Sequence, residues 1–230
     1  MTSRPTLDPV GTLAAFGRAA YSDLTSVVAL SLVFSLATLP LVTLGPAVVA
    51  LVAAQTEGVT GRAAGGKVTE RDRLRVFRTT FREQFRRGLP LGVFVLAVAV
   101  TTIAYAGLAV ANRSGPLLVG AILGGYALSA ALVTVLRAAT LLVREGAPSA
   151  RQALWDAGRH LLSTPSFSVL HALFASLLVV LCLGLGIAAV LLLPGLLAVL
   201  EVVAYEETAG DGALRVVRAY QGTLRTGGGS

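Results

Sequence analysis

The sequence predicts an all-α, polytopic membrane protein with about six transmembrane helices, and three observations carry this prediction. Mean hydropathy is +0.77, 55% of the residues are hydrophobic and only 13% are charged. The chain runs from Leu24 to Ala54 without a charged side chain. A bilayer core of ~30 Å is crossed by ~20 helical residues, so this run is too long for one crossing. Pro40 and Gly45-Pro46 interrupt it, which indicates two helices joined by a tight turn.

Two further apolar runs show the same organisation. One extends from Leu89 to Val143 with a polar break at 111–116, and the other extends from Val169 to Tyr205 with a break at Pro194-Gly195. As a single helix the last run would be ~55 Å long, nearly twice the bilayer core. Each run is therefore interpreted as a helical hairpin, giving three hairpins. The expected spans are 22–40, 46–62, 90–111, 116–142, 168–193 and 195–207.

The placement of the basic residues predicts the orientation. The N-terminal segment, the two long connections and the C-terminal tail carry nearly all of them, whereas the hairpin turns carry Arg113. An excess of arginine marks the cytoplasmic side. We therefore expect residues 1–230 to form one integral domain of the plasma membrane with both termini in the cytoplasm; a five-span arrangement would move one terminus outside. The net charge of +7 then indicates anionic lipid headgroups, not nucleic acid, as a partner.

The connection after the first hairpin predicts a basic amphipathic helix over 69–89. One stripe at helical spacing is apolar: Leu74, Phe77, Phe81, Phe85 and Leu89. The neighbouring stripe is basic: Arg71, Arg75, Arg78, Arg82 and Arg86. Thr69 and Asp72 have the spacing of a capping box. Such a helix is expected to lie flat on the membrane with its rings in the acyl boundary, and 150–162 and 213–224 are weaker versions of it.

Glu201 is the most informative polar residue of the predicted spans. It follows Pro194 by seven residues, which places it ~10 Å inside the membrane core. A carboxylate at that depth costs roughly 2–3 kcal/mol, so it should face the bundle interior. A ligand or proton site and a structural hydrogen bond are both compatible with this position. Arg137 is expected to extend to the headgroups, and His171 is expected at the interface.

Two short Pro- and Gly-interrupted apolar pieces, 46–54 and 194–205, suggest a candidate intramembrane site. In transporters, matching interrupted segments mark the substrate cavity. The residues that this hypothesis brings together are Pro40, Thr43, Gly45, Pro46, Pro194 and Glu201. The alternative is that these residues only form hairpin corners.

The sequence contains no recognisable catalytic constellation. His160, His171 and Cys182 lack the spacing of a metal site. There is no Gly-x-Ser-x-Gly, phosphate-binding loop or His-Glu-x-x-His motif. We therefore expect no enzymatic activity, no cofactor and no metal.

The segment Ala37-Thr-Leu-Pro-Leu-Val-Thr-Leu-Gly-Pro-Ala47, followed by the aromatic and basic segment from Val76 to Phe85, resembles the first-hairpin signature of the YesL-like membrane proteins. The resemblance covers residues 24–95. It implies a small polytopic protein of a family without an established biochemical activity, often found beside carbohydrate-uptake genes. The expected function is a transport-related or accessory role in carbohydrate uptake, with transporter subunits or a second copy of the chain as partners. The alternative is a non-transporting scaffold that docks a cytoplasmic partner or anionic lipid through its arginine-rich helix.

Overall fold

The computed structural model describes residues 9–66, 68–209, 212, 216–218 and 220, and in this part of the chain it is helical with no strand. Its elements follow one another as α1 (Pro9–Ser22), α2 (Leu24–Ala37), the 3₁₀ turn η1 (Leu41–Thr43), α3 (Leu44–Ala63), α4 (Glu70–Glu83), α5 (Phe85–Asn112), α6 (Gly115–Arg144), α7 (Ala150–Ser163), α8 (Pro165–Gly184), α9 (Ile187–Leu191) and α10 (Leu193–Ala209). The prediction of an all-α fold is confirmed.

Four helical segments are long and apolar enough to cross a membrane: Leu41–Ala63, Phe85–Asn112, Gly115–Arg144 and Pro165–Gly184. The consecutive helices α1 and α2 together make a fifth candidate, bent by 82° at Asp23. The described residues thus fit a helical membrane protein with four or five such segments. The count of six spans stays a prediction, since α10 is 17 residues long.

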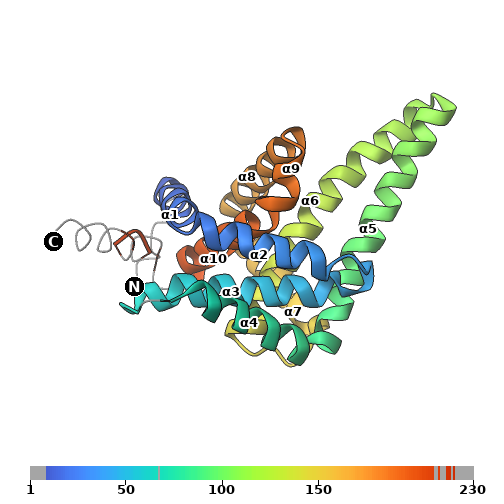
Figure 1. Cartoon of the computed structure of the whole chain (residues 1–230). Helices are drawn as coiled ribbons and strands as arrows, with labels where there is room; N and C mark the ends of the chain where they lie inside the picture. The colour runs from blue at the N-terminus through green and yellow to red at the C-terminus, as the bar shows by residue number, and fades with distance from the viewer. Residues whose placement is uncertain (1–8, 67, 210–211, 213–215, 219, 221–230) are drawn as a thin grey trace.

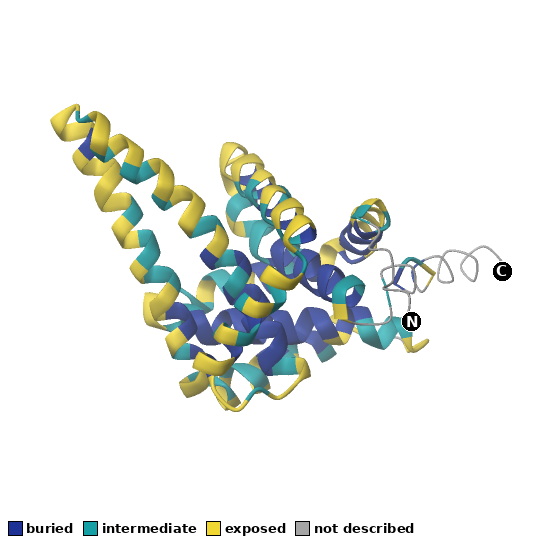
Figure 2. Ribbon diagram, turned by 180° about the vertical axis from the view of Figure 1, so that it is seen from behind, coloured by how far each residue is buried: buried dark blue, intermediate teal, exposed yellow. Residues whose placement is uncertain are grey.

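The helices form a packed centre from which two apolar arms extend. In Figure 1, α5 and α6 run antiparallel and project away from the rest of the chain, whereas α8 and α9 form a second, shorter arm. The helices α4 and α7 lie at the opposite, lower end of this view. Figure 2 shows that the buried residues concentrate in the centre and that the outer part of the α5–α6 arm is exposed. The helices α5 and α6 cover the expected spans 90–111 and 116–142 and are somewhat longer, while the arrangement of the chain as three hairpins stays a prediction.

The centre is built on α3, whose side chains are mostly alanine and valine. It is buried without interruption from Gly45 to Thr56. In the described part of the chain its main helical neighbours are α2, α4, α5, α6 and α10. Small side chains allow so many neighbours to approach one helix axis closely. The expected span 46–62 therefore exists as a helix, but protein covers most of its surface.

Gly45 of α3 lies directly against the backbone of α5. A Cβ atom at this position would lie 2.5 Å from the amide nitrogen of Gly92 and would also collide with the carbonyl oxygen of Gly88. On the other helix, a Cβ on Gly88 would lie 2.7 Å from the Cα of Pro46. The two backbones touch because both helices carry glycine at the crossing.

We expect Gly45→Ala to lower the unfolding free energy by about 1–3 kcal/mol, because the new methyl group meets backbone that cannot rotate away. Thermal unfolding of the protein in detergent measures this change. Gly125→Ala on α6 is the matched control, since nothing lies within 4 Å of a Cβ there. Equal midpoints for the two variants would contradict the prediction.

Three elements differ from their predicted ranges. The expected helix 69–89 is divided, because α4 ends at Glu83 and α5 already begins at Phe85. The expected span 168–193 is broken after Gly184, and Gly186 has a φ of +63°. The expected span 22–40 corresponds to α2 alone, whose 14 residues continue into α1 through the bend. The predicted helix 150–162 is present as α7, whereas 213–224 lies mostly outside the described residues.

Candidate functional site

A large apolar cavity lies where six helices meet. Its volume is about 320 Å³. It is lined by Phe34 of α2, Leu44, Gly45, Val48 and Leu51 of α3, Leu91, Gly92 and Val95 of α5, Leu128, Leu132, Val135 and Leu136 of α6, Val179 of α8, and Leu193, Pro194 and Leu197 of α10. Every lining side chain is apolar. The cavity thus offers side-chain packing but no side-chain hydrogen bond.

The cavity has a buried floor and a half-buried rim. The floor includes Val48, Leu51, Leu91 and Val135, which are all buried. The rim consists of the lining residues with intermediate exposure: Phe34, Leu44, Val95, Leu128, Leu132, Val179, Leu193 and Pro194. The glycine contact between α3 and α5 is part of the wall, since Gly45 and Gly92 both line the cavity.

Glu201 lies in a separate buried ion cluster formed by α6, α8 and α10. Its side chain is 0% exposed, and its Oε1 is 2.6 Å from Nε of Arg137. Its Oε2 is 3.4 Å from Nε2 of His171. The guanidinium of Arg137 also donates a hydrogen bond of 3.0 Å to Thr208 Oγ1. A carboxylate in such a place requires a cationic neighbour, and Arg137 provides it.

One expectation for this region is wrong. Arg137 does not extend to the surface, because its side chain is 4% exposed and is paired with Glu201. His171 is buried within the protein, and its expected depth at the membrane interface stays a prediction. The prediction that Glu201 faces the bundle interior agrees with its complete burial. The pairing itself could not be read from the chain, because the partners lie on three helices far apart in sequence.

A second buried ion cluster is centred on Asp23, at the bend between α1 and α2. Its carboxylate accepts hydrogen bonds from the Arg73 guanidinium (2.6 Å) and the Tyr220 hydroxyl (2.9 Å), and it also pairs with Arg62. Arg73, which is 1% exposed, donates a further bond of 3.3 Å to Gln55. Burial, together with the Asp23 charge, raises the pKa of the Tyr220 hydroxyl, so this group stays a donor. One carboxylate thereby connects α2, α3, α4 and the C-terminal segment.

Helix α4 has the predicted amphipathic pattern and the predicted capping box. The Thr69 hydroxyl donates 2.6 Å to the Asp72 carboxylate, and this bond lowers the pKa of the Asp72 carboxyl. The apolar stripe, however, packs against protein: Phe77 is buried, and Leu74 and Phe81 pack against the core. For Phe77 the expectation that the ring lies in the acyl boundary is therefore wrong, whereas for the half-buried rings of Phe81 and Phe85 it stays a prediction. The basic stripe is exposed throughout, and we call it the arginine face: Arg71, Arg75, Arg78, Arg82 and, on α5, Arg86.

The structure divides the six residues of the predicted intramembrane site. Gly45 and Pro194 line the apolar cavity, whereas Glu201 belongs to the cluster with Arg137. Pro46 packs against Gly88. Pro40 and Thr43 form the turn before α3, where the Thr43 hydroxyl donates to the carbonyl oxygens of Ala37 and Pro40. Among the described residues no group of three His, Cys, Asp or Glu side chains is placed to hold a metal ion.

No protein-family model matches the chain, and no characterised protein or solved structure matches it either. The likeness to the YesL-like proteins therefore stays a prediction from the residues.

Proposed function

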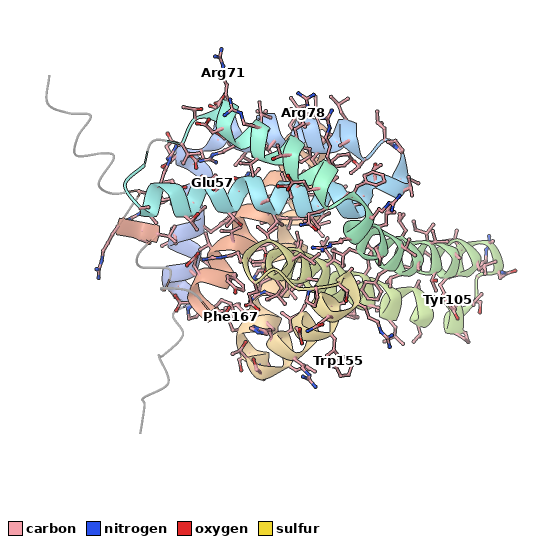
Figure 3. All side chains as sticks on the ribbon, turned by 90° about the horizontal axis from the view of Figure 1, so that it is seen from below. Glu57, Arg71, Arg78, Tyr105, Trp155 and Phe167 are labelled. Atoms are coloured by element: carbon pink, nitrogen blue, oxygen red, sulfur yellow. The ribbon has the colours of Figure 1, made fainter. Side chains whose placement is uncertain are left out.

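We propose that this protein is an accessory or scaffold protein of the plasma membrane, with cytoplasmic termini, that docks an acidic partner through the arginine face. The observation that carries the proposal is the surface of α4. Its exposed residues are all polar: Glu70, Arg71, Arg75, Arg78, Thr79, Arg82 and Glu83. A helix that rested on acyl chains would expose apolar residues instead. We therefore place this face toward the aqueous side, with Arg71 and Arg78 at the edge seen in Figure 3.

The arginine face is also held in a fixed position. The capping box fixes the start of α4, Phe77 anchors its middle, and Arg73 is clamped to Asp23 on the opposite side of the helix. None of the arginine-face residues has an ion pair within the described part of the chain. A preformed row of free guanidinium groups recognises carboxylates or phosphates at low entropic cost.

The other basic helix at this end has a different surface. On α7, Trp155 and Leu162 are 65% and 80% exposed. Arg159 lies over the Trp155 ring, with its guanidinium carbon 5.3 Å from the ring centroid. Exposed tryptophan beside arginine is typical of a membrane interface. We infer that α7 meets the headgroups, which leaves α4 for a protein partner.

In carbohydrate uptake, we expect the partner protein and not this chain to carry the sugar. A sugar path needs polar side chains, because each buried hydroxyl without a hydrogen bond is costly, and the lining of the apolar cavity between the helices has none. We therefore propose an accessory role beside a transporter subunit, not a path through this chain.

The test places a photo-crosslinking amino acid at position 78, with position 126 on the exposed apolar arm as control, in cells of the native host. We expect crosslinks to one acidic protein from position 78 alone. These crosslinks should be lost when the same chain also carries Arg71→Gln, Arg75→Gln and Arg82→Gln. The pair Arg151→Gln and Arg159→Gln on α7 should leave them unchanged. Uptake of labelled mono- and oligosaccharides by the same strains shows whether that partner belongs to sugar transport. Crosslinks only to lipid from position 78 would overturn the scaffold proposal.

A further inference from the structure

The lining of the apolar cavity defines the chemistry of its ligand. A water molecule needs two to four polar partners to be held in a protein interior, and none of the lining side chains is polar. The same lining excludes sugars and ions, which would lose their hydrogen bonds on entering. An apolar ligand is the class that this cavity accepts.

The volume favours a chain over a single small ring. A cavity of about 150 Å³ lined by aliphatic and aromatic side chains takes up benzene. At 320 Å³ this cavity has room for roughly a dozen carbon atoms on the same scale. It is lined by residues from six helices, so a flexible chain that enters at the rim contacts side chains of several helices.

The rim indicates where the ligand comes from. Phe34, Leu132 and Val179 are half-buried, so each contacts both the cavity and the outer surface of the protein. The same helices expose further apolar side chains beside the rim, among them Leu36 (67%) and Val180 (67%). In a chain whose helices are long and apolar enough to cross a membrane, this surface is in contact with lipid tails. The rim between this surface and the cavity is therefore apolar.

We propose that the cavity binds one acyl chain of a membrane phospholipid, taken up sideways from the bilayer across this rim. The cavity wall between α3 and α5 is preformed, because the backbone of Gly45 is in direct contact with the backbones of Gly88 and Gly92. This site is separate from the arginine face and does not depend on the proposed docking function.

The test uses the full chain in phosphatidylcholine vesicles that contain a phospholipid with a diazirine near the end of one acyl chain. After illumination, peptide mass spectrometry is expected to find label on the lining segments 128–136 and 179. Val179→Phe fills the cavity, and we expect it to lower this label about tenfold, a difference of about 1.4 kcal/mol. Val180→Phe is the matched control, since it adds the same atoms to the neighbouring, lipid-exposed position.

A second variant keeps the result interpretable if Val179→Phe folds poorly. Leu132→Ala enlarges the cavity without a clash, so it should keep or raise the label while Val179→Phe lowers it. Label that changes in the same direction in both variants, or that is confined to the outer α5–α6 arm, overturns the proposal. Labelling by a diazirine fatty acid but not by the phospholipid overturns the assignment of the source. The arginine-face variants should leave the label unchanged, so the two proposals fail independently.

Discussion

Asp23→Ala is expected to destabilise the protein by about 3–5 kcal/mol, the cost of removing one member of a buried ion pair. The substitution leaves the Arg73 guanidinium, which is 1% exposed, with only the 3.3 Å bond to Gln55. It also removes the acceptor for Tyr220 and the partner of Arg62. Because total stabilities are typically 5–15 kcal/mol, a loss of this size should be visible as a large fall in the unfolding midpoint in detergent.

The control and the rescue follow from the same contacts. Glu70→Ala removes an exposed acidic residue of α4 and should leave the midpoint unchanged. In the double variant Asp23→Ala, Arg73→Leu the stranded charge is gone, so part of the lost stability should return. A loss below about 1 kcal/mol in Asp23→Ala, the range of exposed ion pairs, would show that the cluster does not hold the bend.

Glu201→Ala is expected to have an effect of similar size, about 3–5 kcal/mol, since it isolates the buried Arg137 in the centre of the protein. Glu201→Gln should be milder, because the amide keeps the volume and still accepts a hydrogen bond from the guanidinium. We therefore expect Glu201→Gln to be expressed and folded with a lower midpoint. Unfolding of both variants in detergent, measured beside the exposed control Glu83→Gln, tests this order.

Replacing Arg137 and Glu201 together distinguishes a structural role of this ion pair from a functional one. A double variant with Arg137→Met and Glu201→Leu replaces both charges by apolar side chains of comparable size, which often preserves stability. If this variant folds and retains the crosslink and uptake phenotypes of the native chain, the pair serves the fold. If it folds and loses them, Glu201 takes part in the activity. A midpoint of Glu201→Ala equal to that of the native chain would contradict the prediction of stability loss.

The sequence predicts the helices of this protein well, but it does not predict which protein segment or lipid surface packs against each of them. The periodicity of Phe77 and Phe81 and the capping pair Thr69–Asp72 correctly indicated a helix with one apolar face. What covers that face could not be deduced, because lipid tails and a protein interior are both apolar and select the same side chains. The arginine face was recognisable for the opposite reason, since only water, headgroups or an acidic partner accept such a row.

The buried clusters were missed or only half recognised for the same physical reason. Glu201 was identified because a carboxylate is costly in an apolar segment, but nothing in the local sequence specifies that Arg137 lies opposite it. Asp23 carries no such signal, because an aspartate at the start of an apolar run is also typical of the polar boundary of a span. An aspartate directly between two helical apolar stretches, followed at a distance by Arg62 and Arg73, is the only available signal. Both ion clusters are formed by contacts between residues far apart in sequence, and local helix preferences carry no information about such contacts.

The enclosure of α3 has a consequence for how the protein is made. Among the described elements that contact it, α2 and the turn η1 precede it in the chain, whereas α4, α5, α6 and α10 follow. At about 5–20 residues per second, the ribosome needs roughly 7–30 s after Ala63 to reach the end of α10. During this interval the buried Gln55 and Thr56 lack part of their final surroundings. During biosynthesis the central helix α3 is therefore already made, in the bilayer or in its insertion machinery, before α10 is available to pack against it.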